Sequence, residues 1–187
     1  MGVAAKYDLS GRELIRMVPT VSTVEVPAPT LDPAELAAVA GRLASFANRW
    51  SALAAPHPDR RWYARLHRDA VHEVWLLGWD RAQGIDLHDH GGSAGAFCVV
   101  TGRLVEAYTD RASQRLVRRR RVGPGEVLAF GPEHVHDLVN PGPDVAISLH
   151  VYSPPLQAMT FYDDAPGTFL SRLRTEPADS PEGSGVA

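Results

Sequence analysis

Two histidines separated by a single residue, His88 and His90, have the types and spacing best suited to metal chemistry. Side chains of a β-strand alternate between its two faces, so these imidazoles project from the same face if the segment is extended. Further along the chain, His136 supplies a third imidazole in another short apolar segment. Neutral imidazole binds iron, copper, nickel and zinc. The pattern therefore predicts a mononuclear metal site held by β-strands.

Short segments of alternating hydrophobicity surround these histidines and must position them. They run from residue 61 to residue 173 and are separated by turns rich in glycine or proline, as at 80–84, 123–125 and 141–143. Several short strands with turn signals at regular spacing are typical of an antiparallel sandwich or barrel. We therefore expect a fold dominated by β-structure, with the three histidines on the wall of a small barrel.

Residues 1–60 have helical patterns, so we expect N-terminal helices that pack on the barrel. Ser10 and Glu13 have the spacing of a capping box and predict a short first helix. Asp32 is a candidate N-cap and Pro33 suits the first position of a second helix. Apolar residues recur there at helical spacing, which favours packing against the protein's own sheet over binding of a partner. This stripe consists of Leu36, Val39, Leu43, Phe46 and Trp50.

Composition divides the chain into three parts. Residues 1–60 form the helical extension, residues 61–173 form the barrel with the metal site, and residues 174–187 are small and polar, which predicts a disordered tail. Four consecutive arginines at 118–121 could suggest binding of nucleic acid. Strand alternation would send them to opposite faces, so a solvated edge strand whose charges discourage edge pairing is favoured.

Charge and cysteine content limit the partners and the compartment. The 187 residues carry a formal net charge of −3, which gives no electrostatic reason to expect nucleic acid or an anionic membrane. The sequence lacks a run of about 18 apolar residues that would span a membrane, and its N-terminus lacks the apolar core of a signal peptide. The single cysteine, Cys98, excludes an intrachain disulfide and suits a reducing compartment. We expect a cytoplasmic protein and a monomer.

The spacing around His88 and His90 resembles the first motif of the cupin superfamily. That motif has a glutamate after four further residues and a glycine after six more, and this chain has Gly95 and Gly102 at those positions. Without the glutamate, three neutral imidazoles leave the full charge of a divalent ion to exogenous ligands, which favours an anionic donor such as a thiolate. A cupin fold that holds only a structural or adventitious metal is the alternative.

The segment from Gly125 to Asn140 resembles the second cupin motif, Gly-x5-Pro-x-Gly-x2-His-x3-Asn. Its outer glycine, histidine and asparagine fall on Gly125, His136 and Asn140, whereas its proline and inner glycine are replaced. Both motifs favour His136 over His134 as the third ligand, and His134 would be a loop residue or a support for a ligand. The resemblance implies a double-stranded β-helix, the jelly-roll barrel of cupins.

Within the cupins, the chain is similar to the thiol dioxygenases, especially the bacterial type of the cysteine dioxygenase type I family. Residues 148–155 read Ser-Leu-His-Val-Tyr-Ser-Pro-Pro, where the family has Ser-Leu-His-x-Tyr-Ser-Pro-Pro. Tyr63 and Arg65 match the family's Tyr-x-Arg before the metal strands. The similarity covers roughly residues 60–163. It implies an enzyme, a non-haem Fe(II) dioxygenase.

The resemblance implies the metal ligands and the reaction. His88, His90 and His136 would bind Fe(II). L-cysteine would chelate the iron through its thiolate and its amine, which leaves one position for O2. Both oxygen atoms would end on sulfur and give cysteine sulfinate, a reaction of cysteine catabolism.

The family also implies residues that bind the substrate and the oxygen. Arg65 would hold the substrate carboxylate in its guanidinium fork, with support from Tyr63. Tyr152, oriented by His150 through a hydrogen-bond relay, would stabilise the bound oxygen. Met159 would cap the substrate pocket or belong to the core.

One departure concerns a covalent crosslink of the animal enzymes. They carry a cysteine where this chain has Gly95, joined by a thioether to the tyrosine that corresponds to Tyr152. Gly95 cannot form this link, and bacterial members commonly have glycine there. Cys98 would lie on the opposite face of the strand and is expected to be a small buried residue. A cis peptide bond before Pro154 is also implied.

Two other functions stay open. A dioxygenase of 3-mercaptopropionate or another thiol would resemble this chain, but such relatives commonly have glutamine at the position of Arg65 and take the carboxylate from another arginine. Arg65 therefore favours cysteine. A non-catalytic metal-binding cupin, such as a small-molecule sensor, would have no use for Arg65 and Tyr152.

Overall fold

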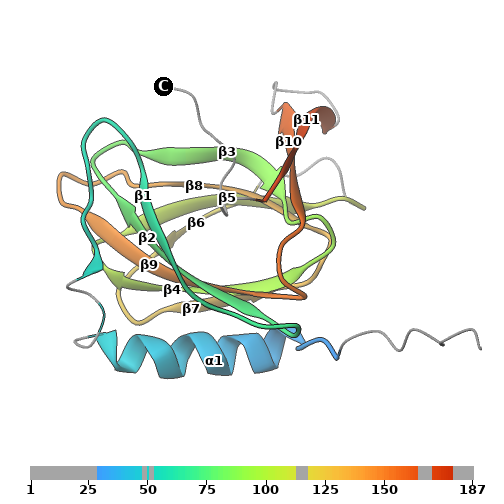
Figure 1. Cartoon of the computed structure of the whole chain (residues 1–187). Helices are drawn as coiled ribbons and strands as arrows, with labels where there is room; N and C mark the ends of the chain where they lie inside the picture. The colour runs from blue at the N-terminus through green and yellow to red at the C-terminus, as the bar shows by residue number, and fades with distance from the viewer. Residues whose placement is uncertain (1–28, 48–49, 51–52, 113–117, 164–169, 179–187) are drawn as a thin grey trace, which may run out of the picture.

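Figure 1 shows the computed structural model, which describes residues 29–47, 50, 53–112, 118–163 and 170–178. Within these residues, one helix precedes a series of eleven strands. The elements are α1 Pro33–Ser45, β1 Trp62–Arg68, β2 Glu73–Trp79, β3 Gly84–Asp89, β4 Ala94–Thr101, β5 Leu104–Asp110, β6 Arg118–Val122, β7 Val127–Phe130, β8 His134–Val139, β9 Ala146–Ser153, β10 Ala158–Asp163 and β11 Ser171–Pro177.

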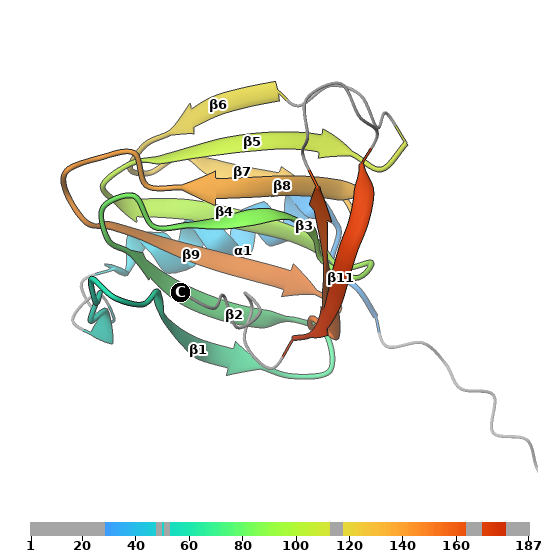
Figure 2. The same cartoon turned by 90° about the horizontal axis from the view of Figure 1, so that it is seen from above.

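The strands form two antiparallel sheets that face each other. One sheet has the order β1-β2-β9-β4-β7 and the other has the order β11-β10-β3-β8-β5-β6. Strands distant in sequence become neighbours, as where β9 lies between β2 and β4. Figures 1 and 2 show the two sheets enclosing a common interior, with the β10–β11 pair at one end. This is a double-stranded β-helix, so the predicted cupin fold is confirmed.

Inward-facing side chains fill the space between the sheets. The interior cluster draws residues from both, including Trp75 of β2, Phe97 of β4, Leu138 of β8 and Phe161 of β10. A slip of one residue in any strand would turn these side chains to the outer face. The apolar interior therefore also determines which polar side chains point inward, namely those on the same face of a strand as the apolar ones.

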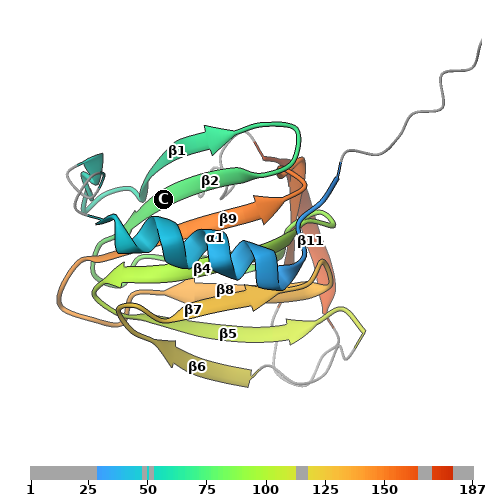
Figure 3. The ribbon, with the colours of Figure 1, turned by 90° about the horizontal axis from the view of Figure 1, so that it is seen from below.

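Helix α1 covers the outer face of the five-stranded sheet, as Figure 3 shows. It begins where the sequence predicts, because Asp32 Oδ1 accepts from the Glu35 N–H at 2.9 Å and Glu35 Oε2 accepts from the Asp32 N–H at 2.8 Å. Leu36 is fully buried beneath the helix. The helix ends at Ser45, so Phe46 of the predicted stripe is instead its C-cap and is about half exposed.

The predicted disordered tail, residues 174–187, is wrong at its first residues. The last strand, β11, continues to Pro177 and pairs with β10. The prediction failed because polar side chains of this strand also pack on the barrel: the Arg174 guanidinium lies 3.9 Å from the ring centroid of Phe161. Residues 179–187 lie outside the described residues.

Other expectations concern the surface and the N-terminus. Strand β6 is at the edge of the six-stranded sheet, and three of its four arginines are exposed, so the predicted solvated edge strand is confirmed. No helix among the described residues is long and apolar enough to cross a membrane. The short helix predicted near Ser10 lies outside the described residues.

Candidate active site

Three histidine side chains meet inside the barrel where β3 lies beside β8. His88 of β3 pairs in register with His136 of β8, and His90 follows the end of β3 directly. All three are buried, and one ligand atom from each ring lies within 4.8 Å of the other two. The three residues predicted to bind metal therefore lie together and can share one ion.

The hydrogen bonds of these rings leave nitrogen atoms for a metal. His88 Nδ1 donates to the Asp86 carbonyl at 2.7 Å, and His136 Nδ1 donates to Glu106 Oε1 at 2.7 Å, so the lone pair of each ring is on Nε2. Neither ring nitrogen of His90 has a hydrogen-bond partner within the described part of the chain, although both are buried. Leaving a buried polar group unsatisfied is costly. A metal ion would satisfy the ring nitrogen of His90 that carries the lone pair, so the three residues fit a metal centre.

Burial also keeps the imidazoles in the neutral form that metals bind. Removal from water lowers the pKa of His88 and of His90 well below the ordinary value, and repulsion between the neighbouring histidines adds to the effect. Burial likewise lowers the pKa of His136, although its hydrogen bond to Glu106 acts in the opposite direction. Metal ions bind deprotonated imidazole. The centre is therefore competent to bind a metal at neutral pH.

Glu106 of β5 is a residue that sequence reasoning missed. Its buried carboxylate accepts hydrogen bonds from His136, from His134 Nε2 at 3.0 Å and from Arg120. Burial raises the pKa of Glu106, but the hydrogen bonds from the histidines and Arg120 outweigh burial and hold it below the ordinary value. The sequence could have indicated Glu106, because it lies two residues after Leu104 and so on the same, buried face of the strand. His134 belongs to this support and lies in β8, not in a loop.

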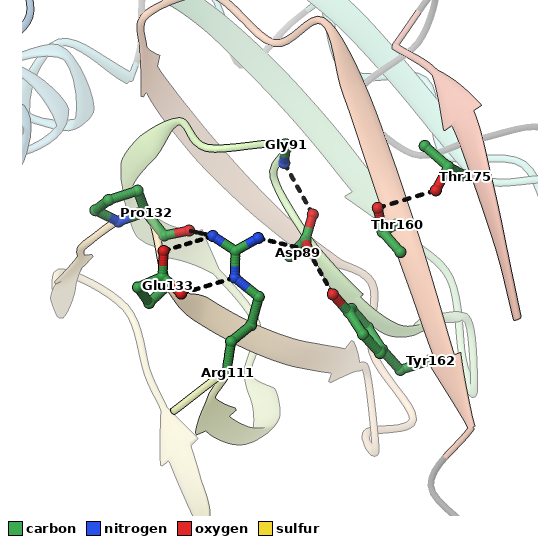
Figure 4. Close-up of polar contacts among 8 residues, drawn as sticks. All are labelled: Asp89, Gly91, Arg111, Pro132, Glu133, Thr160, Tyr162 and Thr175. Atoms are coloured by element: carbon green, nitrogen blue, oxygen red, sulfur yellow. Dashed lines mark hydrogen bonds and ion pairs between the residues drawn. The ribbon is translucent and has the colours of Figure 1, made fainter. Parts of the chain in front are cut away.

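Asp89, between the two ligand-type histidines, takes part in a separate polar network, shown in Figure 4. Its carboxylate accepts hydrogen bonds from the Tyr162 hydroxyl at 2.7 Å and from the Gly91 N–H at 2.9 Å. It also lies 3.5 Å from Arg111, which pairs with Glu133 at 2.6 Å. Gly91 has a φ of +60°, a conformation that glycine adopts at little cost. The network ties the end of β3 to β10 and so holds the strand that carries the histidines.

A buried chain of hydrogen bonds runs along β9 towards the histidines. The Trp79 indole N–H donates to Ser148 Oγ at 2.8 Å, Ser148 Oγ lies 2.8 Å from His150 Nε2, and His150 Nδ1 lies 3.1 Å from Tyr152 Oη. The indole N–H can only donate, so Ser148 Oγ accepts from it. If Ser148 in turn donates its own proton to His150 Nε2, the proton of the neutral imidazole is on Nδ1, which then donates to Tyr152 Oη. In that arrangement the Tyr152 hydroxyl accepts from His150 and keeps its own proton for another acceptor. The Tyr152 ring lies beside the His90 ring, with centroids 5.0 Å apart.

The protonation states agree with this direction. Burial lowers the pKa of His150 to about 3, so its imidazole is neutral and carries one proton. Burial raises the pKa of Tyr152 far above the ordinary value, so its hydroxyl keeps its proton at neutral pH. Tyr152 can therefore donate a hydrogen bond without placing a charge in the interior.

Tyr63 and Arg65 face the interior from β1, the edge strand of the five-stranded sheet. They pair in register with Leu77 and Trp75, both members of the interior cluster. The Arg65 guanidinium lies 5.2 Å from the Trp75 ring centroid, and the Tyr63 ring meets Trp75 edge-on at 6.1 Å. Tyr63 is 42% exposed and Arg65 is exposed, so solvent reaches this edge. No hydrogen bond or ring contact among the described residues joins either residue to the three histidines.

Phe130 explains why a glycine occupies position 95. A Cβ at Gly95 would lie 2.5 Å from Phe130 Cζ and 3.0 Å from Tyr152 Cδ1. The Phe130 ring in turn stacks on His90, with centroids 4.9 Å apart. A larger side chain at residue 95 would displace a ring that packs on a ligand-type histidine. Cys98 lies on the opposite strand face, buried towards α1, and its burial raises the pKa of the thiol.

Two further expectations concern the segment after β9. The peptide bond between Ser153 and Pro154 is cis, as the family resemblance implied. Met159 of β10 is fully buried within the interior cluster, which is the core position expected as one of its two roles. Its capping of a substrate pocket stays a prediction.

A second group of ligand-type side chains lies outside the barrel, at the turn between β1 and β2. His67, Asp69 and His72 are close enough to share an ion. However, the Asp69 carboxylate accepts from the backbone N–H groups of Val71 and His72 at 2.8 Å each, and from His67 at 3.1 Å. These hydrogen bonds therefore close the turn.

The geometry predicts different outcomes for two neighbouring histidine substitutions. His136→Ala removes one of the three converging imidazoles, so the metal retained after gel filtration should fall to background. His134→Ala removes only a partner of Glu106, so most of the metal should be retained. Elemental analysis of both variants alongside the wild-type protein provides the measurement. Normal metal content in His136→Ala would refute its assignment as a ligand.

The comparison with protein families agrees with this geometry. The chain matches the family model of cysteine dioxygenase type I over residues 13–165. Among solved structures, TT1209 from Thermus thermophilus is 18% identical, with 56% of this chain and 93% of that chain covered at a TM-score of 0.49. A cupin superfamily protein from Desulfitobacterium hafniense is 13% identical, with 55% and 85% covered at a TM-score of 0.47. Because the family model spans the three histidines and the β9 relay, the chain belongs to the cysteine dioxygenase type I family.

Proposed function

We propose that the protein is an Fe(II)-dependent cysteine dioxygenase, which adds both atoms of O2 to the sulfur of L-cysteine and releases cysteine sulfinate. Membership of the family indicates a thiol dioxygenase with a metal site. The observation that carries the proposal is the unsatisfied His90 among three buried histidines, with the Tyr152 ring beside it. A metal ion and a hydrogen-bond donor for oxygen would thus share one site.

Iron is the metal that suits this reaction. Imidazole ligands accommodate Fe(II), and bound iron would deprotonate the thiol and supply the electrons that activate O2. His88, His90 and His136 bring no negative charge of their own to the ion. The thiolate of the substrate would supply that charge. The location in the cytoplasm, the monomeric state and the role in cysteine catabolism stay predictions.

Arg65 and Tyr63 would bind the substrate carboxylate at the accessible edge of the barrel. A guanidinium offers parallel N–H groups that match a carboxylate in a bidentate pair. The Trp75 ring supports the guanidinium face, with 5.2 Å between the Arg65 Cζ and the ring centroid. This support leaves the edge of the guanidinium for the substrate, and Met159 would line the inner side.

Tyr152 would donate a hydrogen bond to the oxygen that is transferred. The relay from Trp79 through Ser148 and His150 supports this role, because a proton on His150 Nδ1 would leave the Tyr152 hydroxyl free to donate. The Phe97 ring stacks on His150 with centroids 5.2 Å apart and shields the relay from water. A fixed donor in a dry site stabilises developing negative charge on oxygen without reorganisation.

A dioxygenase of 3-mercaptopropionate is the second candidate, and one observation favours it. Arg61 precedes β1 and also reaches the interior, where its guanidinium lies 5.3 Å from the Trp79 ring centroid. Burial lowers the pKa of Arg61 to about 10, so it is still charged at neutral pH. This second arginine would bind the carboxylate of a thiol without an amine. A non-catalytic sensor is the third candidate.

An oxygen electrode tests the proposal directly. The iron-loaded protein would receive L-cysteine and 3-mercaptopropionate in parallel. We expect thiol-dependent oxygen uptake, faster with L-cysteine, and cysteine sulfinate as the product. Faster uptake with 3-mercaptopropionate would overturn the substrate assignment. The absence of uptake with either thiol, in protein that retains iron, would leave only the sensor.

The substitution Arg65→Gln tests the carboxylate site. Loss of a charge-assisted pair worth about 1.5–3 kcal/mol should raise the KM for L-cysteine by about 10- to 100-fold, with kcat much less affected. Arg42→Gln, on the exposed surface of α1, is the matched control and should leave both constants unchanged. An unchanged KM in Arg65→Gln would mean that another group binds the carboxylate.

A further inference from the structure

The buried carboxylate of Glu106 is the starting observation. It is 0% exposed, and one oxygen, Oε1, accepts from His136 Nδ1 at 2.7 Å and from His134 Nε2 at 3.0 Å. The other oxygen, Oε2, accepts from Arg120 Nε. A buried charge is tolerated only when it is paired and hydrogen-bonded. These contacts meet that condition, and one of them reaches a member of the histidine triad.

We propose that Glu106 is a positioning residue and the counter-charge of the metal centre, acting through His136. Its carboxylate holds the proton of His136 on Nδ1, so the lone pair of Nε2 is directed to the ion. A carboxylate behind a ligand imidazole also makes that imidazole a stronger donor. The inference rests on the triad being a metal centre and deepens the proposed function.

The three histidines differ in the hydrogen-bond partner of the ring nitrogen that would not bind the metal. Glu106 is important because it is the partner of one of them. His88 Nδ1 donates to a neutral backbone carbonyl, that of Asp86. His90 has no hydrogen-bond partner within the described part of the chain. Only His136 of the triad is backed by a carboxylate among the described residues. This chain has Gly95 where the cupin motif has a glutamate, and the carboxylate of Glu106 would act on the ion only through the His136 ring.

Arg120 opposes the effect of Glu106 on the metal. Its guanidinium pairs with the far oxygen of the carboxylate and lies 4.2 Å from the Tyr108 ring centroid. It stabilises the buried carboxylate, but it also neutralises part of the charge that would attract a cation. Removal of either partner breaks the same ion pair, yet the two removals change the charge near the ion in opposite directions.

Because the two removals should change metal affinity in opposite directions, a comparison of the two variants tests the proposal. Glu106→Gln and Arg120→Gln would be compared with the wild-type protein by competition for Co2+ against a chelator, followed by the visible absorption of bound cobalt. Glu106→Gln should weaken Co2+ binding by about 10- to 100-fold. Arg120→Gln should leave Co2+ binding unchanged or tighter. Thermal unfolding should show lower stability for both variants, because each loses the ion pair.

The double variant Glu106→Gln/Arg120→Met guards against a failure of the single variant to fold. It leaves no unpaired buried charge, so it should fold, and it should bind Co2+ as weakly as Glu106→Gln. Equal loss of affinity in Glu106→Gln and Arg120→Gln would mean a merely structural role and would overturn the proposal. Wild-type affinity in Glu106→Gln or in the double variant would also overturn it.

The same experiment separates this inference from the proposed function. Competition for Co2+ requires neither a thiol nor oxygen. A wild-type protein that consumes no oxygen with any thiol would disprove the dioxygenase and leave the role of Glu106 intact. Conversely, tight Co2+ binding by Glu106→Gln would disprove the role of Glu106 in a protein that still oxidises L-cysteine.

Discussion

The register between β3 and β8 is the constraint on which the rest of the site depends. It places His88 opposite His136, and His90 follows from the same end of β3. A shift of one residue would turn these imidazoles out of the barrel, because strand side chains alternate with period 2. The apolar cluster between the sheets holds the register from inside, and the hydrogen bond between Asp89 and Tyr162 ties the other edge of β3 to β10.

Around the pairing of β3 with β8, neutral and charged polar groups lie in separate parts of the barrel. The relay that ends at Tyr152 is buried and neutral, and it presents a proton rather than a charge. Glu106 carries a negative charge but is separated from the ion position by the His136 ring. The accessible positive charge lies at the β1 edge, on Arg65. Under the proposed function, the anionic sulfur of the substrate would meet the histidines and its carboxylate would meet Arg65.

Local patterns predicted those parts of the site whose residues are close in sequence. Strand geometry predicted the His-x-His pair, and α1 begins at its predicted cap. The relay of Ser148, His150 and Tyr152 was predicted from the resemblance to the family's segment at residues 148–155. Glu106 escaped prediction because its partners lie on other strands, with His136 thirty residues away. The packing of Phe130 against residue 95 escaped for the same reason. Such contacts depend on which strands are neighbours in the sheets, and the hydrophobic periodicity of the sequence does not reveal that order.

Anaerobic titration of the cobalt-substituted protein with L-cysteine tests the central claim most directly, that the three histidines hold a metal to which a thiolate binds. We predict a thiolate-to-cobalt charge-transfer band in the near ultraviolet that grows with L-cysteine. L-serine, which has a hydroxyl in place of the thiol, should produce no such band. If cobalt is bound and saturating L-cysteine produces no band, the thiolate does not bind the metal, and this result would contradict the claim.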